Sequence, residues 1–202
     1  MSCSPLVFFF TNLPQDVVNI LTKDLDERYE DKCEPSLLHG KTNYNKLRSS
    51  YNAWVTDSHW VSGFIWHYVM KANQTNFQYD IDNIDGNNLQ YTRYGPGETY
   101  GWHVDHGLLD MNQKESRASS DGIPVVTDES QRKLSFSLQL SGPDDYTGGN
   151  FQLLDDNNDF IVAPRQLGAL VVFDSRLRHR VCPVKTGTRR SLVGWVMGPR
   201  FR

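Results

Sequence analysis

Residues 100–107, YGWHVDHG, place two histidines and an aspartate between positions 103 and 106. His103 and Asp105 are two residues apart, which is the side-chain period of a β-strand, so both side chains would leave the same face of a strand. Imidazole and carboxylate groups are common ligands of divalent transition metals. The spacing therefore predicts two ligands of a metal site, and the alternative is a polar surface turn.

A metal site needs a third ligand from elsewhere in the chain. The other histidines are His39, His59, His67, His106 and His179. We favour His179, because it follows the apolar run GALVVFD and opens the strand-like run HRVCPV, and a jelly roll can bring two such distant strands together. Two histidines and one carboxylate form a facial triad with three open coordination positions, which suits non-haem Fe(II) oxygenases.

Ten residues after His179 comes a candidate anion-binding residue, Arg189, in KTGTRRSLVGW. If this segment is a strand, Arg189 shares one face with Ser191, Val193 and Trp195, while Arg190 points away. A guanidinium that faces a core needs an anionic partner, and it suits bidentate binding of a carboxylate. The alternative is an arginine paired with an internal Asp or Glu.

The elements that must position these residues change in character along the chain. Two helices are expected within residues 12–30 and 57–74, where apolar side chains recur at helical spacing, and the run LVFFF (Leu6–Phe10) is read as a buried strand. After these the period switches to two. The strand-like runs are FQYDID, LQYTRY, YGWHVD, KLSFSLQL, GGNFQLL, DFIVAP, GALVVFD, HRVCPV and RSLVGWVM. Short strands at this spacing, separated by turn residues, favour a mainly β fold, an antiparallel sandwich or jelly roll with the N-terminal helices packed on one sheet.

At 202 residues the chain is expected to form a single domain, with a helical support over about 1–85 and a jelly-roll core over about 86–202. One polar segment, Gly107 to Gln131, lacks a periodic core and follows the His/Asp pair directly. Loops of this length are uncommon in compact domains. It is either a lid over the site or a surface excursion.

Composition sets further bounds. The chain has three widely spaced cysteines, which form neither a disulfide framework nor a zinc cluster and fit a reducing compartment. The LVFFF run is too short for a signal-peptide core or a membrane span. We therefore expect a soluble cytoplasmic protein. Eight Lys or Arg and no Asp or Glu follow Ser175, which is either a solvated basic edge or a site for an anionic ligand.

Together, YGPGETYGWHVD, RKLSFSLQLS, GGNFQLL and HRVCPVKTGTRRSLVGW resemble the Fe(II)/2-oxoglutarate-dependent dioxygenases, in particular the prolyl 4-hydroxylase-like branch with the PKHD-type hydroxylases. The resemblance covers about residues 89–197. In that family Tyr-Gly-x-Gly and Tyr-x-x-His-x-Asp are followed by a distant His, a basic residue about ten further on, and a Trp six beyond that. The matching positions are Tyr94, Tyr100, His103, Asp105, His179, Arg189 and Trp195.

The resemblance implies a role for each position. His103, Asp105 and His179 would hold Fe(II). Arg189 would bind the distal carboxylate of 2-oxoglutarate and Tyr94 would hydrogen-bond the same cosubstrate, while Tyr100 and Trp195 would line the substrate entrance. Collagen-type members have Lys in place of Arg189, and some relatives have a cosubstrate-binding Tyr in place of Gln139.

The implied cofactors are Fe(II), 2-oxoglutarate and O2, with ascorbate as a candidate reductant. The implied activity is hydroxylation of a protein or peptide side chain such as proline. Two alternatives stay open: the same chemistry on a nucleic-acid base or small metabolite, and a non-catalytic jelly-roll binding module. We expect no membrane partner, and the sequence does not predict the oligomeric state.

Overall fold

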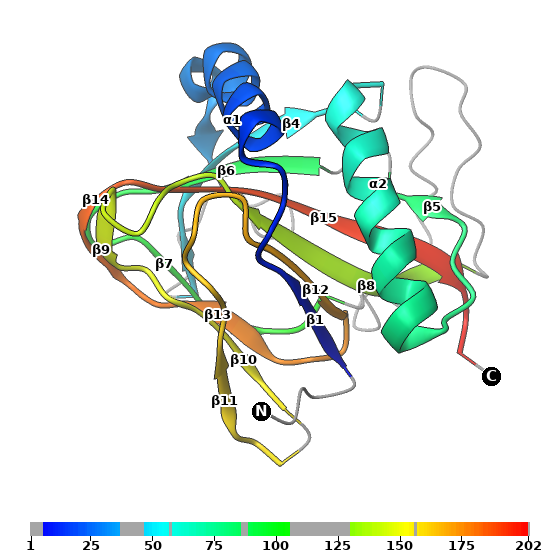
Figure 1. Ribbon diagram of the computed structural model, residues 1–202. Helices are drawn as coiled ribbons and strands as arrows, with labels where there is room; N and C mark the ends of the chain where they lie inside the picture. The colour runs from blue at the N-terminus through cyan, green and yellow to red at the C-terminus, as the bar shows by residue number, and fades with distance from the viewer. Residues whose placement is uncertain are drawn as a thin grey trace.

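The computed structural model describes residues 6–36, 47–56, 58–85, 89–105, 130–155 and 157–201. The core of the fold consists of two facing antiparallel sheets (Figure 1). The larger, eight-stranded sheet runs in the order β1 (Val7–Phe10), β12 (Leu170–Asp174), β8 (Ser130–Gln139), β15 (Arg189–Pro199), β6 (Leu89–Tyr94), β4 (Tyr51–Val55) and β2 (Glu34–Pro35), with β5 (Asn83–Ile84) also paired to β15.

The smaller sheet has five strands, in the order β11 (Phe160–Val162), β10 (Phe151–Leu154), β13 (His179–Val181), β7 (Thr99–His103) and β3 (Arg48–Ser49). A separate two-stranded ribbon joins β9 (Tyr146–Gly148) to β14 (Val184–Gly187). This arrangement, with helices on one sheet, confirms the predicted mainly β jelly roll.

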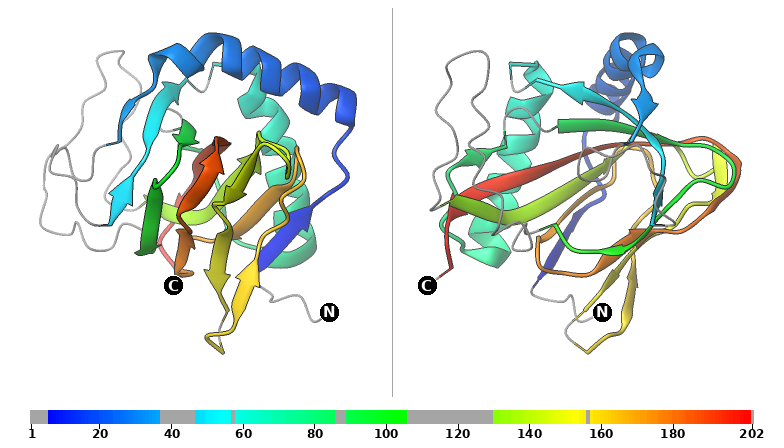
Figure 2. Two further views of the ribbon diagram at one scale, coloured as in Figure 1. Left: turned by 90° about the vertical axis from the view of Figure 1, so that its left-hand side faces the viewer. Right: turned by 180° about the vertical axis from the view of Figure 1, so that it is seen from behind.

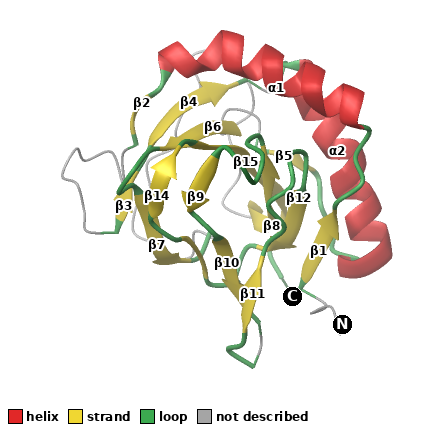
Figure 3. Cartoon of the chain, turned by 60° about the vertical axis from the view of Figure 1, so that its left-hand side comes forward, coloured by secondary structure: helices red, strands yellow, loops and turns green. Residues whose placement is uncertain are grey.

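Both long helices cover one face of the eight-stranded sheet (Figure 3). Helix α1 (Gln15–Tyr29) buries Leu21 and Leu25, and helix α2 (Trp60–Ala72) buries Ile65 and Val69. A short 3-10 turn, η1 (Glu30–Lys32), follows α1, and a π-helical turn, η2 (Asn73–Phe77), follows α2. These spacings are the ones that the sequence predicted for amphipathic helices. In the part of the chain that the structure describes, no helix is long and apolar enough to cross a membrane.

Strand β8 carries apolar side chains on one face and polar side chains on the other. Leu134, Phe136 and Leu138 join the core under the helices. Ser135 and Ser137 alternate with them and are equally buried, because their face is covered by the smaller sheet. The polar face of this strand therefore points into the space between the sheets, and not to solvent.

The N-terminal part of the chain contributes strands as well as helices. β1 pairs with β12, β4 pairs with β6, and β3 pairs with β7 of the smaller sheet. Figure 2 shows these blue and cyan strands beside strands from the rest of the chain. One expectation is wrong: FQYDID is not a strand. Phe77 ends the π-helical turn, and Gln78 adopts a left-handed conformation (φ 55°) that redirects the chain toward β5.

Residues 106–129 lie outside the described part of the chain. This range holds His106 and all but the last two residues of the predicted Gly107 to Gln131 lid, whose role therefore stays a prediction. His39, another histidine considered as a ligand, also lies outside.

A buried polar network ties helix α1 to the outer face of the large sheet. The hydroxyl of the fully buried Tyr91 lies 2.6 Å from Asp26 Oδ1 and 2.5 Å from Glu30 Oε2. Arg190 Nε donates to Glu30 Oε2 at 2.7 Å. Burial raises the pKa of Asp26, while the hydrogen bonds from Arg190 and Tyr91 outweigh burial and lower the pKa of Glu30. Arg190 thus lies on the face opposite Arg189, as the strand alternation predicted.

Replacement of Tyr91 by Phe should lower the free energy of unfolding by about 1–3 kcal/mol, because the half-buried carboxylates of Asp26 and Glu30 lose the one hydroxyl proton that lies between them. Urea denaturation measures the change. Tyr68→Phe is the matched control, since Tyr68 is partly buried in the same core and its contacts are made by the ring. Equal losses in the two variants would contradict this account of the network.

Candidate functional site

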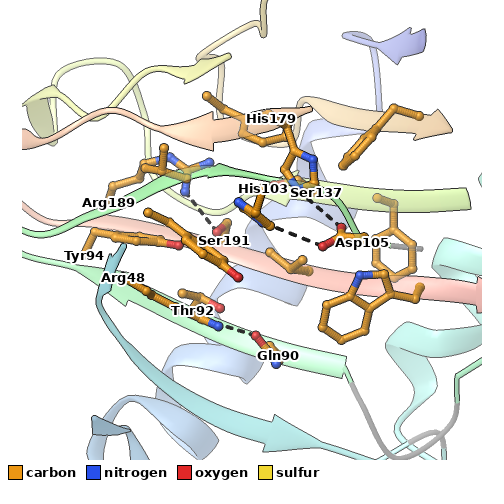
Figure 4. Close-up of a pocket in the computed structure, with 17 residues that line it drawn as sticks. Arg48, Gln90, Thr92, Tyr94, His103, Asp105, Ser137, His179, Arg189 and Ser191 are labelled. Atoms are coloured by element: carbon orange, nitrogen blue, oxygen red, sulfur yellow. Dashed lines mark hydrogen bonds and ion pairs between the residues drawn. The ribbon is translucent and has the colours of Figure 1, made fainter. Parts of the chain in front are cut away.

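Three side chains predicted as metal ligands converge between the two sheets. His103 and His179 lie directly opposite each other in the antiparallel pairing of β7 with β13. Asp105 follows two residues after His103, beyond the end of β7. Its Oδ2 lies 3.3 Å from His179 Nε2 and its Oδ1 lies 3.7 Å from His103 Nε2 (Figure 4). One ligand atom from each residue lies within 4.8 Å of the other two, so a single ion could contact all three.

Backbone carbonyls fix the orientation of both imidazoles. His103 Nδ1 lies 2.8 Å from the carbonyl oxygen of Gly101, and His179 Nδ1 lies 3.0 Å from that of Leu177. A carbonyl can only accept, so each Nδ1 carries the proton and donates. Each ring therefore turns its Nε2 toward Asp105, and an Nδ1–H bonded to a backbone carbonyl is the usual arrangement of metal-binding histidines.

The electrostatics of the three groups favour a cation. Burial, followed by the nearby His179, lowers the pKa of His103 to about 4, so this imidazole is neutral at neutral pH. Burial acts to raise the pKa of Asp105, but the two imidazoles outweigh it and the pKa lies below its usual range. Burial acts to lower the pKa of His179, and the Asp105 carboxylate outweighs it and raises that pKa. The site therefore holds an ionised carboxylate and attracts positive charge beside it.

Arg189 is a buried cation in the same cavity. Its side chain points inward from β15, the residue is 2 % exposed, and Nη1 donates to Ser191 Oγ at 3.1 Å. Nε is buried without a hydrogen-bond partner, and no described acidic residue forms an ion pair with the guanidinium. Burial of a charge in this state is costly unless an anion completes it. Among the described residues, no Asp or Glu is therefore the internal partner of Arg189 that the sequence left open as an alternative.

Aromatic side chains form the walls around these groups. Tyr94 pairs with Arg189 across β6 and β15, and its ring lies 5.7 Å from the guanidinium carbon. The Tyr100 ring stacks on His103, with centroids 3.6 Å apart and planes 13° apart. Trp195 lines the same cavity, and its indole Nε1 is buried without a partner among the described residues. All seven residues singled out in the sequence line one cavity: Tyr94, Tyr100, His103, Asp105, His179, Arg189 and Trp195.

A second buried arginine in the cavity was missed by sequence reasoning. Arg48 donates from Nε to Ser50 Oγ at 2.9 Å and from Nη2 to Gln90 Oε1 at 3.3 Å. Its guanidinium carbon lies 4.7 Å from the Tyr100 ring. Arg48 reaches the cavity only because β3 pairs with β7, a contact between segments about fifty residues apart that no local pattern announces.

Other residues raised by the sequence lie away from the site. His59 caps the N-terminus of α2, where its Nδ1 accepts from Val61 N, and His67 is exposed on the same helix. The amide of Gln139 donates to the Tyr146 hydroxyl at 3.0 Å and to the Ser141 carbonyl. Gln139 is held in the core by these bonds and does not line the cavity.

Sequence comparison agrees with this geometry. Residues 89–197 match the model of the 2OG-Fe(II) oxygenase superfamily. A PKHD-type hydroxylase of Synechococcus elongatus is 36% identical over 108 residues, 54% of this chain and 42% of that protein. A PKHD-type hydroxylase of Crocosphaera subtropica is 34% identical over 130 residues, 63% of this chain and 51% of that protein. The chain thus spans about half or less of the length of these relatives.

Solved structures share the fold. A prolyl-4-hydroxylase of Pseudomonas putida superposes with a TM-score of 0.66 at 20% identity, covering 96% of this chain and 93% of that one. A Trichoplax adhaerens prolyl hydroxylase, solved with a peptide fragment of the hypoxia inducible factor oxygen degradation domain, has a TM-score of 0.67 at 17% identity, covering 95% and 83%. The family model covers more than half of the chain, and the chain therefore belongs to the 2OG-Fe(II) oxygenase superfamily.

Proposed function

We propose that this protein is an Fe(II)- and 2-oxoglutarate-dependent dioxygenase that hydroxylates a C–H bond. Its superfamily is named for Fe(II) and 2-oxoglutarate, which supports this cofactor requirement. The observation that carries the proposal is the convergence of His103, Asp105 and His179 in a cavity that also buries the uncompensated cation Arg189.

The three converging side chains would hold the iron. Two imidazoles with Nε2 turned inward and one ionised carboxylate provide the donor set of the facial triad, and a bound ion would displace the proton that Asp105 favours on His179. Such a triad leaves three coordination positions for a bidentate cosubstrate and O2. When bound, Fe(II) supplies the chemistry that splits 2-oxoglutarate and O2 into succinate and CO2 and inserts the remaining oxygen atom into a C–H bond of the substrate.

Arg189 would bind the far carboxylate of 2-oxoglutarate. Its unpartnered Nε and its Nη groups match the bidentate geometry of a carboxylate, which would compensate the buried charge. Tyr94, its cross-strand neighbour, would donate a hydrogen bond to the same cosubstrate. Phe151 and Phe173 pack against His179 at ring distances of 5.7 and 4.8 Å and keep the metal end of the cavity dry.

The substrate we propose is a protein or peptide side chain such as proline, with Tyr100 and Trp195 facing it. The names of the PKHD-type and prolyl hydroxylases that this chain resembles support that class. The basic C-terminal stretch adds little support for a nucleic-acid substrate, because several of its cations have internal partners: Arg176 pairs with Asp174, Arg180 with Gln152, and Arg190 with Glu30.

Single substitutions of the three ligands by Ala should abolish 2-oxoglutarate-dependent succinate formation while the far-ultraviolet circular dichroism spectrum stays unchanged. Loss of one donor leaves a site that cannot hold the ion in its working geometry. His67→Ala, on the exposed face of α2, is the control. Full activity in His179→Ala would remove that residue from the site and make His106 the third ligand.

Arg189→Met should weaken 2-oxoglutarate binding by about 2–5 kcal/mol, since the cosubstrate loses its charged partner in a desolvated site. Mn(II) affinity should stay near normal, and the ligand-free variant should be at least as stable as the wild type because an uncompensated buried charge is removed. Calorimetric titration measures both ligands. The exposed Arg178→Met is the matched control, because Arg190 pairs with Glu30 and its loss would disturb the fold. Unchanged 2-oxoglutarate affinity in Arg189→Met would contradict the assignment.

The substrate class is tested by supplying proline-containing peptides from a protease digest, with single-stranded oligonucleotides in a parallel reaction. We expect peptides that gain the mass of one oxygen atom and an increase in succinate above the uncoupled rate. If only the oligonucleotides increase succinate formation, the result would contradict a protein substrate but would still support the oxygenase activity.

A further inference from the structure

Two buried serine hydroxyls support the Asp105 carboxylate. Ser135 Oγ, on β8, donates to Asp105 Oδ2 at 2.8 Å, and Ser135 Oγ also lies 2.9 Å from Ser175 Oγ. Both serines are 0 % exposed. A hydroxyl has a single proton, so if Ser135 gives its proton to Asp105, Ser175 must be the donor in the second bond. The hydrogen bonds therefore run from Ser175 to Ser135 to Asp105.

Ser175 belongs to the turn between β12 and β13, and this turn contacts two of the proposed ligands. The Ser175 carbonyl accepts from the backbone N–H of Asp105 at 2.9 Å, and its own N–H donates to the carbonyl of Lys133 at 3.1 Å. Two residues later the Leu177 carbonyl accepts from His179 Nδ1. One short segment thus sets the position of the carboxylate residue and the orientation of an imidazole.

The turn is itself fixed by a buried carboxylate outside the cavity. Asp174 accepts from the Tyr79 hydroxyl at 2.6 Å and from the backbone N–H of Arg176 at 2.8 Å, and its carbonyl accepts from Leu177 N at 3.0 Å. The guanidinium of Arg176 pairs with the same carboxylate. These bonds leave Ser175 little freedom to move away from Asp105.

We propose that Ser135 and Ser175 are positioning residues for the metal centre, an inference that rests on the proposed function. Asp105 lies beyond the last residue of β7, so the strand ladder does not hold its side chain, and an unsupported carboxylate can rotate. The hydroxyl relay fixes that rotation and keeps both oxygens close to the two Nε2 atoms. Loss of such outer-shell bonds typically weakens metal affinity about 10–100-fold.

The test is a calorimetric titration of the full chain with Mn(II), without 2-oxoglutarate or substrate. Ser135→Ala should bind Mn(II) about 10–100-fold more weakly than the wild type. Ser175→Ala should show a smaller loss, because Ser135 can still donate to Asp105. Ser62→Ala removes a buried hydroxyl on α2, remote from the site, and should bind like the wild type.

A second readout separates positioning from general destabilisation. The visible absorption spectrum of the Co(II)-loaded protein reports ligand geometry, and its bands should shift in Ser135→Ala and Ser175→Ala but not in Ser62→Ala. Wild-type Mn(II) affinity and an unchanged Co(II) spectrum in folded Ser135→Ala would overturn the positioning role of the serines and leave the proposed metal centre intact. If Ser135→Ala does not fold, an unchanged spectrum in Ser175→Ala overturns it. Absence of Mn(II) binding to the wild type would instead contradict the proposed metal centre.

Discussion

His103 lies directly opposite His179 in the ladder between β7 and β13, and a shift of this pairing by one residue would turn one imidazole out of the cavity. The rest of the site depends on that register. Asp105 follows two residues after His103, and Leu177 precedes His179 by two, so the pairing brings both residues to the cavity. Hydrogen bonds to Ser135, Ser175 and Asp174 then hold them there. The register shifts after the pair, between His179 and Val181, so that Val181 lies opposite Tyr100.

Strands β8 and β15 carry different side chains on their two faces. Toward the helices β8 presents Leu134, Phe136 and Leu138, and toward the smaller sheet it presents Ser135 and Ser137. Arg189 and Arg190 are neighbours in sequence but belong to different faces. One lacks an anion among the described residues, and the other is neutralised by Glu30 in a network with Tyr91. This contrast separates a charge that is compensated within the fold from one that the proposed function assigns to a ligand.

The sequence predicted what depends on local pattern and spacing. The two helices, the alternation of β8 and the inward face of Arg189 all follow from periodicity, and the motif around His103 pointed to the family. Arg48 was missed, since its place in the cavity results from a non-local strand pairing. The alternation of KLSFSLQL places Ser135 on the polar face of a strand, but its hydrogen bond to Asp105 depends on the burial of that face under the smaller sheet, which no local pattern indicates. FQYDID alternates like a strand, yet the π-helical end of α2 occupies its first residue.

The central claim is that one ion lies between His103, Asp105 and His179 while Arg189 holds the far end of 2-oxoglutarate. The most direct measurement is a crystal structure with Mn(II) and an unreactive 2-oxoglutarate analogue, with the metal located by anomalous scattering. The account predicts a single anomalous peak in contact with both Nε2 atoms and an Asp105 oxygen, and the distal carboxylate of the analogue on the Arg189 guanidinium. A peak away from these three residues, or an analogue whose distal carboxylate is bound by Arg48 instead, would contradict it.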